Sequence, residues 1–262
     1  MSIPHKPENQ TVGGPLSGRI ALVTGGTRGI GRAIALKLAS AGSDVAIVYH
    51  NSHEEAEAVC AAIRQLGRQA QAMQADVSEP ELVAEVFATV RQQFSRLDLL
   101  VSNAAVGVLR PALELTLKHW RRCMETNALA LNLLAQHAVP LMPTGGRIIA
   151  LSSLGAVRAI PQYAFIGASK AALESLARSL AQELGPRGIR VNVVSAGVVD
   201  TDALKYFPNR EQLLAEFGRR APAGPTLTAE AVADAVYLLC LPEAAMITGH
   251  TLVVDGGYCI SG

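Results

Sequence analysis

The sequence predicts an α/β fold in which one doubly wound domain carries a seven-stranded parallel sheet, helices on both faces and a lid after the sixth strand. Short runs rich in β-branched residues alternate with longer periodic segments, which is typical of repeated strand–helix–strand units. Half of the 262 residues are hydrophobic and only 4% are aromatic, as expected when aliphatic strands are buried under helices on both sides. No internal repeat or low-complexity linker divides the chain, so we expect one large domain.

The alternating pattern predicts the order of the elements. Seven strands are expected at residues 20–24, 45–49, 70–74, 97–102, 147–151, 190–195 and 251–254. Six helices are expected at residues 30–41, 54–66, 80–94, 118–139, 167–184 and 229–241. Strands that alternate with helices in this way are joined by crossover connections and run parallel.

The N-terminal segment and the overall charge limit the classes of function. Residues 1–17 are polar and contain three prolines, so we expect a flexible arm before a domain that spans 18–262. No run resembles a signal peptide or reaches the length of a membrane span, which favours a cytoplasmic protein. The formal net charge of +1, with both signs interspersed, argues against nucleic acid or an anionic membrane as a partner.

Cysteines and histidines give no sign of a metal centre. The four cysteines are far apart and lack the paired spacing of a metal knuckle or a redox motif, so we expect reduced thiols. The six histidines show no ligand spacing on a common helical face. We therefore expect no metal site.

A glycine-rich turn follows the first predicted strand directly. Gly25, Gly29 and Gly31 open the next helix, so backbone N–H groups and the helix dipole meet a pyrophosphate without obstruction by side chains. This position in a strand–turn–helix unit is typical of the dinucleotide site of a Rossmann-type domain, although the glycine spacing differs from the usual fingerprint.

The end of the second predicted strand indicates which dinucleotide binds. An NAD enzyme places an acidic residue there on the adenosine ribose, but this chain has Asn51 and Ser52 and no acid before Glu54. Arg28 in the glycine turn is suited to bind a ribose phosphate with both arms of its guanidinium, the alternative being an ordinary surface arginine. The expected cofactor is NADPH.

Further residues resemble the motifs of the classical short-chain dehydrogenases/reductases from about residue 18 to 258. They are Asp76-Val77, Ser102-Asn103-Ala104-Ala105, Asn127, Ser153, Lys170 and Val254-Asp255-Gly256-Gly257. The chain departs from the family at Ser102, where an asparagine is usual, and at Ala196, where a proline is usual. The resemblance implies a homotetramer. It also implies cofactor contacts at Gly25, Thr27, Arg28, Gly29, Ile30, Gly31, Asn51, Ser52, Asp76, Val77, Asn103, Ala104, Lys170, Gly197, Val199 and Thr201.

The catalytic tyrosine of the family is displaced in this chain. In the classical pattern it lies four residues before the lysine, where this sequence has Ile166, and the nearby tyrosine is Tyr163, seven residues before Lys170. Seven steps of about 100° fall only about 20° short of two turns, so both spacings return to one helical face. Tyr163 is expected roughly 4.5 Å further from Lys170 along the axis than the classical tyrosine, if the helix extends that far.

This displacement has a chemical interpretation. Hydride addition to a ketone develops charge on the oxygen of the attacked carbon, whereas addition to the β-carbon of an enoyl thioester develops it several bonds away. An acid for the second reaction must stand further from the hydride donor. A tyrosine seven residues before the lysine is the pattern of the enoyl-acyl-carrier-protein reductases in this superfamily.

The sequence is similar to the bacterial NADPH-dependent enoyl-acyl-carrier-protein reductases of type III. The similarity rests on residues 107–111, on Ser152-Ser153-Leu154-Gly155 and on the lid run 200–210. It implies reduction of a trans-2-enoyl thioester, on acyl carrier protein in fatty acid elongation. Two alternatives stay open: a carbonyl or 3-oxoacyl reductase of the same superfamily, and a non-catalytic NADP-binding regulator.

Each candidate catalytic residue has a role and an alternative. Tyr163 is expected to stabilise the enolate oxygen, with Lys170 supplying charge and holding the nicotinamide ribose. Ser153 donates to the thioester oxygen or only bonds to backbone. Asn127 anchors a water chain to Lys170 or serves as a structural amide.

The irregular stretch 198–228 follows the sixth predicted strand, beyond whose carboxyl end ligands of such sheets bind, and is therefore the predicted substrate lid. Its apolar residues are expected to form a wall for an acyl chain or ordinary packing; they are Leu204, Phe207, Leu213, Leu214 and Phe217. Its cationic residues are expected to meet an acidic carrier protein or to form a solvated face; they are Lys205, Arg210, Arg219 and Arg220.

Overall fold

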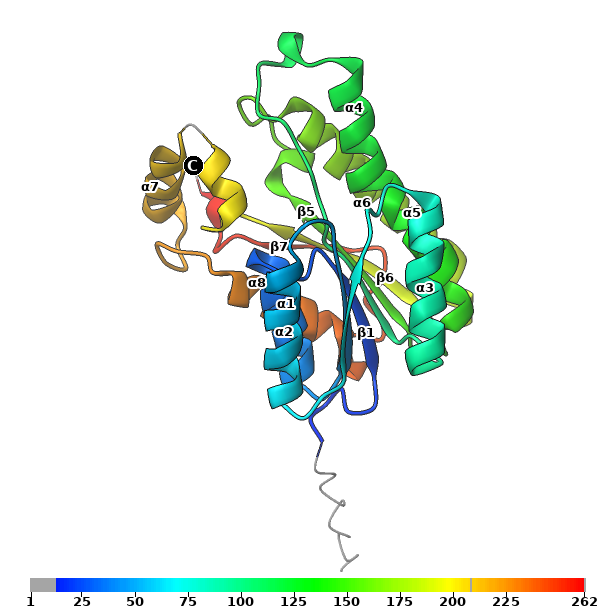
Figure 1. Cartoon of the computed structure of the whole chain (residues 1–262). Coiled ribbons are helices and arrows are strands. Elements are labelled where there is room, and N and C mark those ends of the chain that lie inside the picture. Colours follow the sequence, from blue (N-terminus) through cyan, green and yellow to red (C-terminus); the bar gives the residue numbers. More distant parts are fainter. Residues whose placement is uncertain (1–12, 208, 262) are drawn as a thin grey trace, which may run out of the picture.

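The protein folds around one parallel seven-stranded sheet in the strand order β3-β2-β1-β4-β5-β6-β7 (Figure 1). A computed structural model describes residues 13–207 and 209–261. The strands are β1 (Ile20–Thr24), β2 (Asp44–Tyr49), β3 (Ala70–Gln74), β4 (Leu99–Ser102), β5 (Arg147–Ser153), β6 (Arg190–Ala196) and β7 (Thr251–Val254). All seven predicted strands are present, with boundaries that differ by two residues at most.

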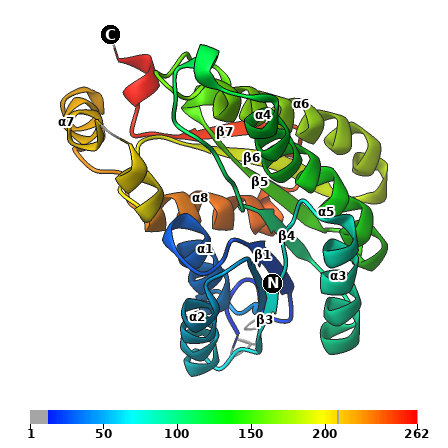
Figure 2. The same cartoon turned by 45° about the horizontal axis from the view of Figure 1, so that its top comes forward.

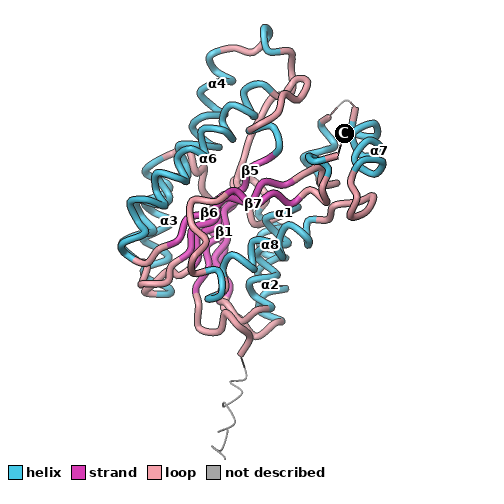
Figure 3. The backbone as a smooth tube through the Cα atoms, turned by 180° about the vertical axis from the view of Figure 1, so that it is seen from behind, coloured by secondary structure: helices cyan, strands magenta, loops and turns pink. Residues whose placement is uncertain are grey.

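Helices cover both faces of the sheet, as Figure 3 shows from behind. One layer contains α1 (Gly29–Ser40), α2 (His53–Gln65) and α8 (Ala229–Cys240). The other contains α3 (Pro80–Phe94), α4 (Leu117–Cys123), α5 (Ala130–Ala138) and α6 (Ala164–Leu184). The remaining helix α7 (Arg210–Arg220) lies beyond the sheet, beside the C-terminal segment (Figure 2). The doubly wound Rossmann architecture expected from the sequence is confirmed.

The hydrophobic core is divided into two clusters by the sheet. In β1, Ala21 and Val23 pack toward the cluster of α1, α2 and α8, whereas Ile20 and Leu22 pack toward that of α3, α5 and α6. Every residue of β1 is buried, because successive side chains point to opposite faces and both faces are covered by helices.

The strand order changes direction between β1 and β4. The chain winds from β1 outward to β3, then returns to β4 on the other side of β1 and winds outward to β7. The loops after β1 and β4 therefore diverge and leave a crevice at the carboxyl ends of these strands, which is where open α/β sheets bind their ligands.

The long helix predicted at residues 118–139 is interrupted. It consists of α4, a π-helical segment η2 (Met124–Leu129), α5 and a 3₁₀ turn. The prediction treated this stretch as one continuous α-helix and did not identify the π turn. Likewise α6 begins at Ala164, three residues before the predicted start.

The N-terminal boundary also differs from the prediction. Residues 1–12 of the expected arm lie outside the described residues. Residues 13–17, which the prediction included in the arm, form a turn against the domain. Leu16 is only 1% exposed in the hydrophobic core, and its backbone N–H donates to the carbonyl of Ala41 at 2.9 Å. The arm was therefore predicted too long, because a single buried leucine leaves no periodic pattern.

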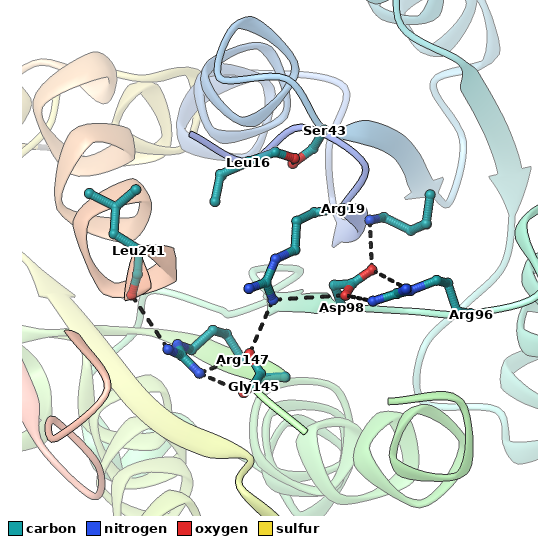
Figure 4. A network of polar contacts seen from close by, with 10 residues as sticks. Leu16, Arg19, Ser43, Arg96, Asp98, Gly145, Arg147 and Leu241 are labelled. Atoms are coloured by element: carbon teal, nitrogen blue, oxygen red, sulfur yellow. Dashed lines mark hydrogen bonds and ion pairs between the residues drawn. The ribbon is translucent and has the colours of Figure 1, made fainter. Parts of the chain in front are cut away.

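A polar network ties the strands together at the amino ends of the sheet, opposite the crevice (Figure 4). Asp98 is fully buried; its carboxylate accepts hydrogen bonds from the backbone N–H of Ile20 at 3.0 Å and from Nε of Arg96 at 3.0 Å. The buried Arg147 guanidinium donates to the carbonyls of Gly145 and Leu241 at 2.8 and 3.4 Å. Nη1 of Arg19 donates to the carbonyl of Gly145 at 3.2 Å, so that the network joins β1, β4 and β5 to the end of α8.

The predicted lid is an excursion whose two ends meet. Val199 and Leu227 form an isolated parallel bridge at its base. Between them lie a 3₁₀ helix η6 (Asp202–Tyr206) and α7. No helix within the described residues is both long and apolar enough to cross a membrane.

Candidate active site

A cavity of about 780 Å³ opens at the carboxyl ends of the strands, beside the crevice between β1 and β4. Sixteen residues were expected from the sequence to contact a cofactor, and all of them line this cavity. They are Gly25, Thr27, Arg28, Gly29, Ile30, Gly31, Asn51, Ser52, Asp76, Val77, Asn103, Ala104, Lys170, Gly197, Val199 and Thr201. The cavity thus joins loops that follow β1, β2, β3, β4 and β6.

The glycine turn after β1 is packed so closely that it excludes side chains. A Cβ at Gly31 would lie 2.1 Å from the carbonyl oxygen of Gly25, and Gly25 itself has a φ of 65°. The backbone therefore requires glycine at both positions and presents the N-terminus of α1 to the cavity. Asn103 fixes this turn from β4, since its Nδ2 donates to the carbonyls of Thr24 and Gly25 at 2.9 and 3.2 Å.

The region next to the end of β2 is polar and contains cationic and neutral groups. Arg28 is the N-cap residue of α1 and lines the cavity together with His50, Asn51 and Ser52. Asp76 after β3 accepts hydrogen bonds from the backbone and hydroxyl of Ser78, at 3.0 and 2.6 Å. No acidic side chain follows β2 directly, so this region fits a phosphorylated ribose better than a free hydroxyl pair.

Tyr163 and Ser153 meet at the inner end of the cavity. Tyr163 is the N-cap residue of α6, and its Oη lies 3.2 Å from Oγ of Ser153, the last residue of β5. Burial raises the pKa of Tyr163, and the hydrogen bond with Ser153 acts in the opposite direction. Tyr163 is therefore a protonated hydrogen-bond donor at neutral pH.

Lys170 lies in the same cavity, on the first half of α6. It is 5% exposed, and its Nζ donates to the carbonyl oxygen of Leu151 at 2.7 Å. Burial lowers the pKa of Lys170 to about 8, while the charge of Glu174 raises it. The ammonium form is thus retained at neutral pH in spite of its burial.

The classical tyrosine position is filled by an aliphatic side chain. Ile166 is buried, and a Cβ at Gly107 would lie only 2.2 Å from its Cδ1. The loop after β4 therefore closes directly over Ile166. Ile166 does not line the cavity, whereas Tyr163 does.

Asn127 has a structural set of contacts. Its Oδ1 accepts from the backbone N–H of Val106 at 2.8 Å, and its Nδ2 donates to the carbonyl of Val106 and to Oγ of Ser169, both at 2.9 Å. Asn127 is not among the residues that line the cavity, where its neighbour Thr126 is found. Its amide joins the π-helical segment η2 to the β4 loop and to α6, as in the structural alternative, and a water chain from Asn127 to Lys170 stays a prediction.

Three of the five expected apolar residues of the lid line the cavity, and Leu214 and Phe217 do not. Leu204, Phe207 and Leu213 line it, and the ring centroids of Phe207 and Tyr163 are 6.0 Å apart. The expectation for Phe217 is wrong: its side chain is 1% exposed in the hydrophobic core and stacks on Tyr258 at 5.5 Å. A helical apolar pattern does not distinguish the side that faces a ligand from the side that faces the core.

Three of the four lid cations are held in ion pairs within the lid. Lys205 contacts Asp202 at 2.5 Å, Arg210 contacts Asp200 at 2.8 Å, and Arg220 contacts Glu216 at 3.0 Å. The basic face expected from the sequence is therefore largely neutralised by neighbouring carboxylates.

Another part of the cavity wall was not predicted, apart from Arg220, which was expected in the lid. This part comes from the loop between β5 and α6, from α7 and from the C-terminal segment; the residues are Arg158, Ala159, Ile160, Pro161, Glu216, Arg220 and Tyr258. Tyr258 donates to Oε1 of Glu216 at 2.9 Å and so attaches the C-terminal segment to α7. The position of Tyr258 just after the strand β7 was the one signal available, since that places it at the carboxyl edge of the sheet.

A glycine cradle for a dinucleotide, joined to a serine at the end of β5 and to a tyrosine and a lysine at the start of α6, defines a short-chain dehydrogenase/reductase. A family model described as Enoyl-(Acyl carrier protein) reductase matches residues 25–259. The chain belongs to this family and is an oxidoreductase of the short-chain dehydrogenase/reductase type. Within the described residues no group of three or more potential ligands is arranged to hold a metal ion.

Known proteins similar to this chain include reductases and a dehydrogenase. A 1-cyclohexenylcarbonyl-CoA reductase of Streptomyces collinus is 43% identical over 92% of this chain and 87% of its own length. A hydroxynaphthalene reductase of Aspergillus fumigatus is 36% identical over 90% of each chain. A short-chain dehydrogenase of Burkholderia cenocepacia, solved in complex with NADP, is 40% identical, with a TM-score of 0.86 over 94% of this chain and 99% of its own.

Proposed function

We propose that this protein reduces the carbon–carbon double bond of a trans-2-enoyl thioester with NADPH. The observation that carries the proposal is the position of the acid. Tyr163 lies seven residues before Lys170 and contacts Ser153, while Ile166 fills the classical position. The hydroxyl therefore stands away from the place where a ketone reductase holds its acid, as addition of hydride to a β-carbon requires.

NADPH is the cofactor that the residues of the cavity fit. The glycine cradle at Gly25 and Gly31 would take the pyrophosphate, and Arg28, Asn51 and Ser52 would surround a ribose phosphate. The relative of Burkholderia cenocepacia, solved with NADP, supports this assignment. When bound, NADPH supplies the hydride for the β-carbon of the substrate.

The chain's own side chains handle the charge that develops on the thioester oxygen. Tyr163 donates a hydrogen bond to that oxygen and stabilises the enolate, while Ser153 keeps the phenol oriented through the 3.2 Å contact. Lys170 keeps a positive charge near the phenol and lies where it would hold the nicotinamide ribose. Leu204, Phe207 and Leu213 exclude water and surround the acyl chain.

The relative from Streptomyces collinus supports this choice of reaction. Its name denotes reduction of a thioester whose carbonyl is conjugated to a ring double bond. The substrate proposed for this chain contains the same conjugated system. The match covers 92% of this chain.

A carbonyl reductase is the second candidate. The hydroxynaphthalene reductase of Aspergillus fumigatus favours it, because its name does not denote reduction of an enoyl thioester. It matches 90% of this chain, nearly as much as the 92% matched by the Streptomyces relative. A Ser–Tyr contact like that between Ser153 and Tyr163 also suits a ketone oxygen.

One assay separates the candidates. NADPH oxidation by the purified protein is followed with crotonyl and acetoacetyl thioesters in parallel, and turnover of the crotonyl compound is expected. Turnover of the acetoacetyl compound alone would overturn the enoyl assignment and favour the carbonyl reductase. NADPH binding without oxidation across a broad thioester panel would instead indicate a non-catalytic regulator.

The carrier of the acyl group is tested with the same assay. The lid cations Lys205, Arg210 and Arg220 are already paired, which weakens the case for an acidic acyl carrier protein in fatty acid elongation. Coenzyme A is the carrier in the name of the Streptomyces relative. We therefore propose a coenzyme A thioester. A kcat/KM tenfold higher for crotonyl-acyl carrier protein than for crotonyl-CoA would contradict it.

We also propose that the protein is a homotetramer. Two groups of large apolar side chains are exposed on the single chain, one around α4 and the other around α8 and β7, as expected for two different contacts between copies. The first group is Leu113, Leu117, Trp120 and Leu129, and the second is Leu238, Met246, Ile247 and Val253. Light scattering after size exclusion should give a mass near four times 27.5 kDa.

A further inference from the structure

Three consecutive residues at the end of β5 each contact a different residue in the first half of α6 or at its N-cap. The carbonyl of Leu151 accepts from Lys170 at 2.7 Å, and Ser153 meets Tyr163 at 3.2 Å. Between them, Oγ of Ser152 donates to Oε1 of Glu174 at 2.6 Å. Two of these contacts involve the proposed catalytic residues, and the third involves a carboxylate that the mechanism above does not use.

Glu174 is an unusual residue for its position. Glu174 is only 7% exposed and lies between α6 and the sheet. Burial of a carboxylate is costly unless donors or an opposite charge compensate it. Ser152 supplies one hydrogen bond, and Lys170 lies one helical turn earlier on the same face of α6. The two buried charges therefore compensate each other.

Among the described residues, Glu174 is the one whose charge acts on the pKa of Lys170. The other titratable groups on the elements packed against α6 come from both the sheet and the neighbouring helices. On the strands they are Arg147 of β5 and Arg190 of β6. On the helical segments they are exposed Glu125 of η2, Lys118, His119, Arg121, Arg122 and Cys123 of α4, His137 of α5 and Arg187 after α6. Arg147 and Arg190 lie at the beginnings of their strands, at the edge of the sheet opposite the cavity.

We propose that Glu174 is a positioning residue that keeps Lys170 protonated and holds the end of β5 in register with α6. Through Ser152 its carboxylate fixes the strand between Leu151 and Ser153, which are the partners of Lys170 and Tyr163. Through its charge it stabilises the Lys170 ammonium, which burial would otherwise neutralise. This inference rests on the proposed function only in assigning Lys170 and Tyr163 to the reaction.

The first experiment measures the protonation of Lys170 directly, without turnover. The protein is labelled with ¹³Cε-lysine, the Lys170 signal is assigned with Lys170→Arg, and the signal is titrated in wild type and Glu174→Gln. Glutamine keeps an acceptor for Ser152 but has no charge. The wild-type signal should titrate near pH 8, and that of the variant roughly one unit lower.

Glu183→Gln is the matched control, because it makes the same change on an exposed residue of the same helix. Its Lys170 signal should titrate as in wild type. An unchanged Lys170 titration in folded Glu174→Gln, or an equal shift in Glu183→Gln, would overturn the inference.

The second experiment measures kcat against pH for the same variants. The alkaline limb should move to lower pH in Glu174→Gln, and Glu174→Asp, which retains the charge, should restore it toward wild type. A merely structural Glu174 would lower kcat equally at every pH. Failure of the wild type to reduce crotonyl thioesters would contradict the proposed function, yet the NMR titration would still decide the role of Glu174.

Discussion

Ser153 Oγ lies 3.2 Å from Tyr163 Oη although Tyr163 stands before the first turn of α6 rather than within it. The contact joins the last residue of a buried strand to the N-cap of a long helix, and so fixes a phenol that the helix itself does not hold. Lys170 is fixed separately, by the carbonyl of Leu151. The acid and the cation of the proposed site are thus positioned by neighbouring residues of β5.

Tyr163→Phe should abolish most turnover while leaving NADPH binding unchanged. The substitution removes the hydroxyl that meets Ser153, and a positioned acid of this kind contributes roughly 10² to 10⁴ in rate. Steady-state kinetics and fluorescence titration with NADPH measure the two effects. Tyr237→Phe, on α8 and outside the cavity, is the control and should keep its activity. Full activity of Tyr163→Phe would show that another group is the acid.

Arg28→Ala should weaken binding of NADPH and leave binding of NADH unaffected. Arg28 lines the cavity at the N-terminus of α1, close to Asn51 and Ser52, where a ribose phosphate would be held. Arg32→Ala removes the same charge from an exposed position of that helix, outside the cavity. Isothermal titration with both cofactors checks the prediction, and equal losses for the two variants would refute a specific role of Arg28.

Gln162 should tolerate glycine and resist a β-branched residue. Its φ of 60° places it in the left-handed region immediately before Tyr163, and its carbonyl accepts from the backbone N–H of Arg110 at 3.2 Å. Valine disfavours this conformation, so Gln162→Val should cost roughly 1–3 kcal/mol or displace Tyr163 and lower kcat. Gln162→Gly should retain both the stability and the kcat of the wild type. Denaturant unfolding and kinetics of the two variants provide the comparison.

Asp98→Ala should destabilise the fold without changing the chemistry of the site. The substitution leaves the buried N–H of Ile20 without its acceptor and removes the partner of Arg96, at a cost of roughly 3 kcal/mol. The exposed pair of Asp234 with Lys37 is the contrast, and Asp234→Ala should cost much less. Urea unfolding measures both; the idea fails if the two losses are similar.

The fold was predictable because its signals are local. The residues of β1, for example, are all buried. A strand buried on both faces needs a short apolar run, and this run is visible in the sequence. The π-helical segment Met124–Leu129 was not predicted, because the sequence is helical on both sides of it and residue type alone does not distinguish a π turn from an α turn. Leu16 was assigned to the arm for a similar reason, since an isolated apolar residue has no period.

The candidate site was predictable where motifs specify backbone geometry. It was less predictable where the direction of a side chain decides whether a residue faces the cavity or the core. Gly25 and Gly31 lie where the sequence placed them, since no other residue fits the turn. Phe217 was misplaced because its orientation depends on a tertiary partner, Tyr258. The ion pair of Arg210 with Asp200 spans ten residues of an irregular loop, which no periodic pattern describes.

The place of Tyr163 outside α6 has a consequence for how such enzymes diverge. Lys170 lies within the hydrogen-bonded turns of α6, whereas Tyr163 stands at its N-cap, directly after the loop that ends at Gln162. Substitutions in that loop can re-aim the acid while the lysine, the glycine cradle and the cofactor stay in place. Selection for a new substrate therefore has a short segment on which to act, and the bond that is reduced becomes a trait separable from the coenzyme that reduces it.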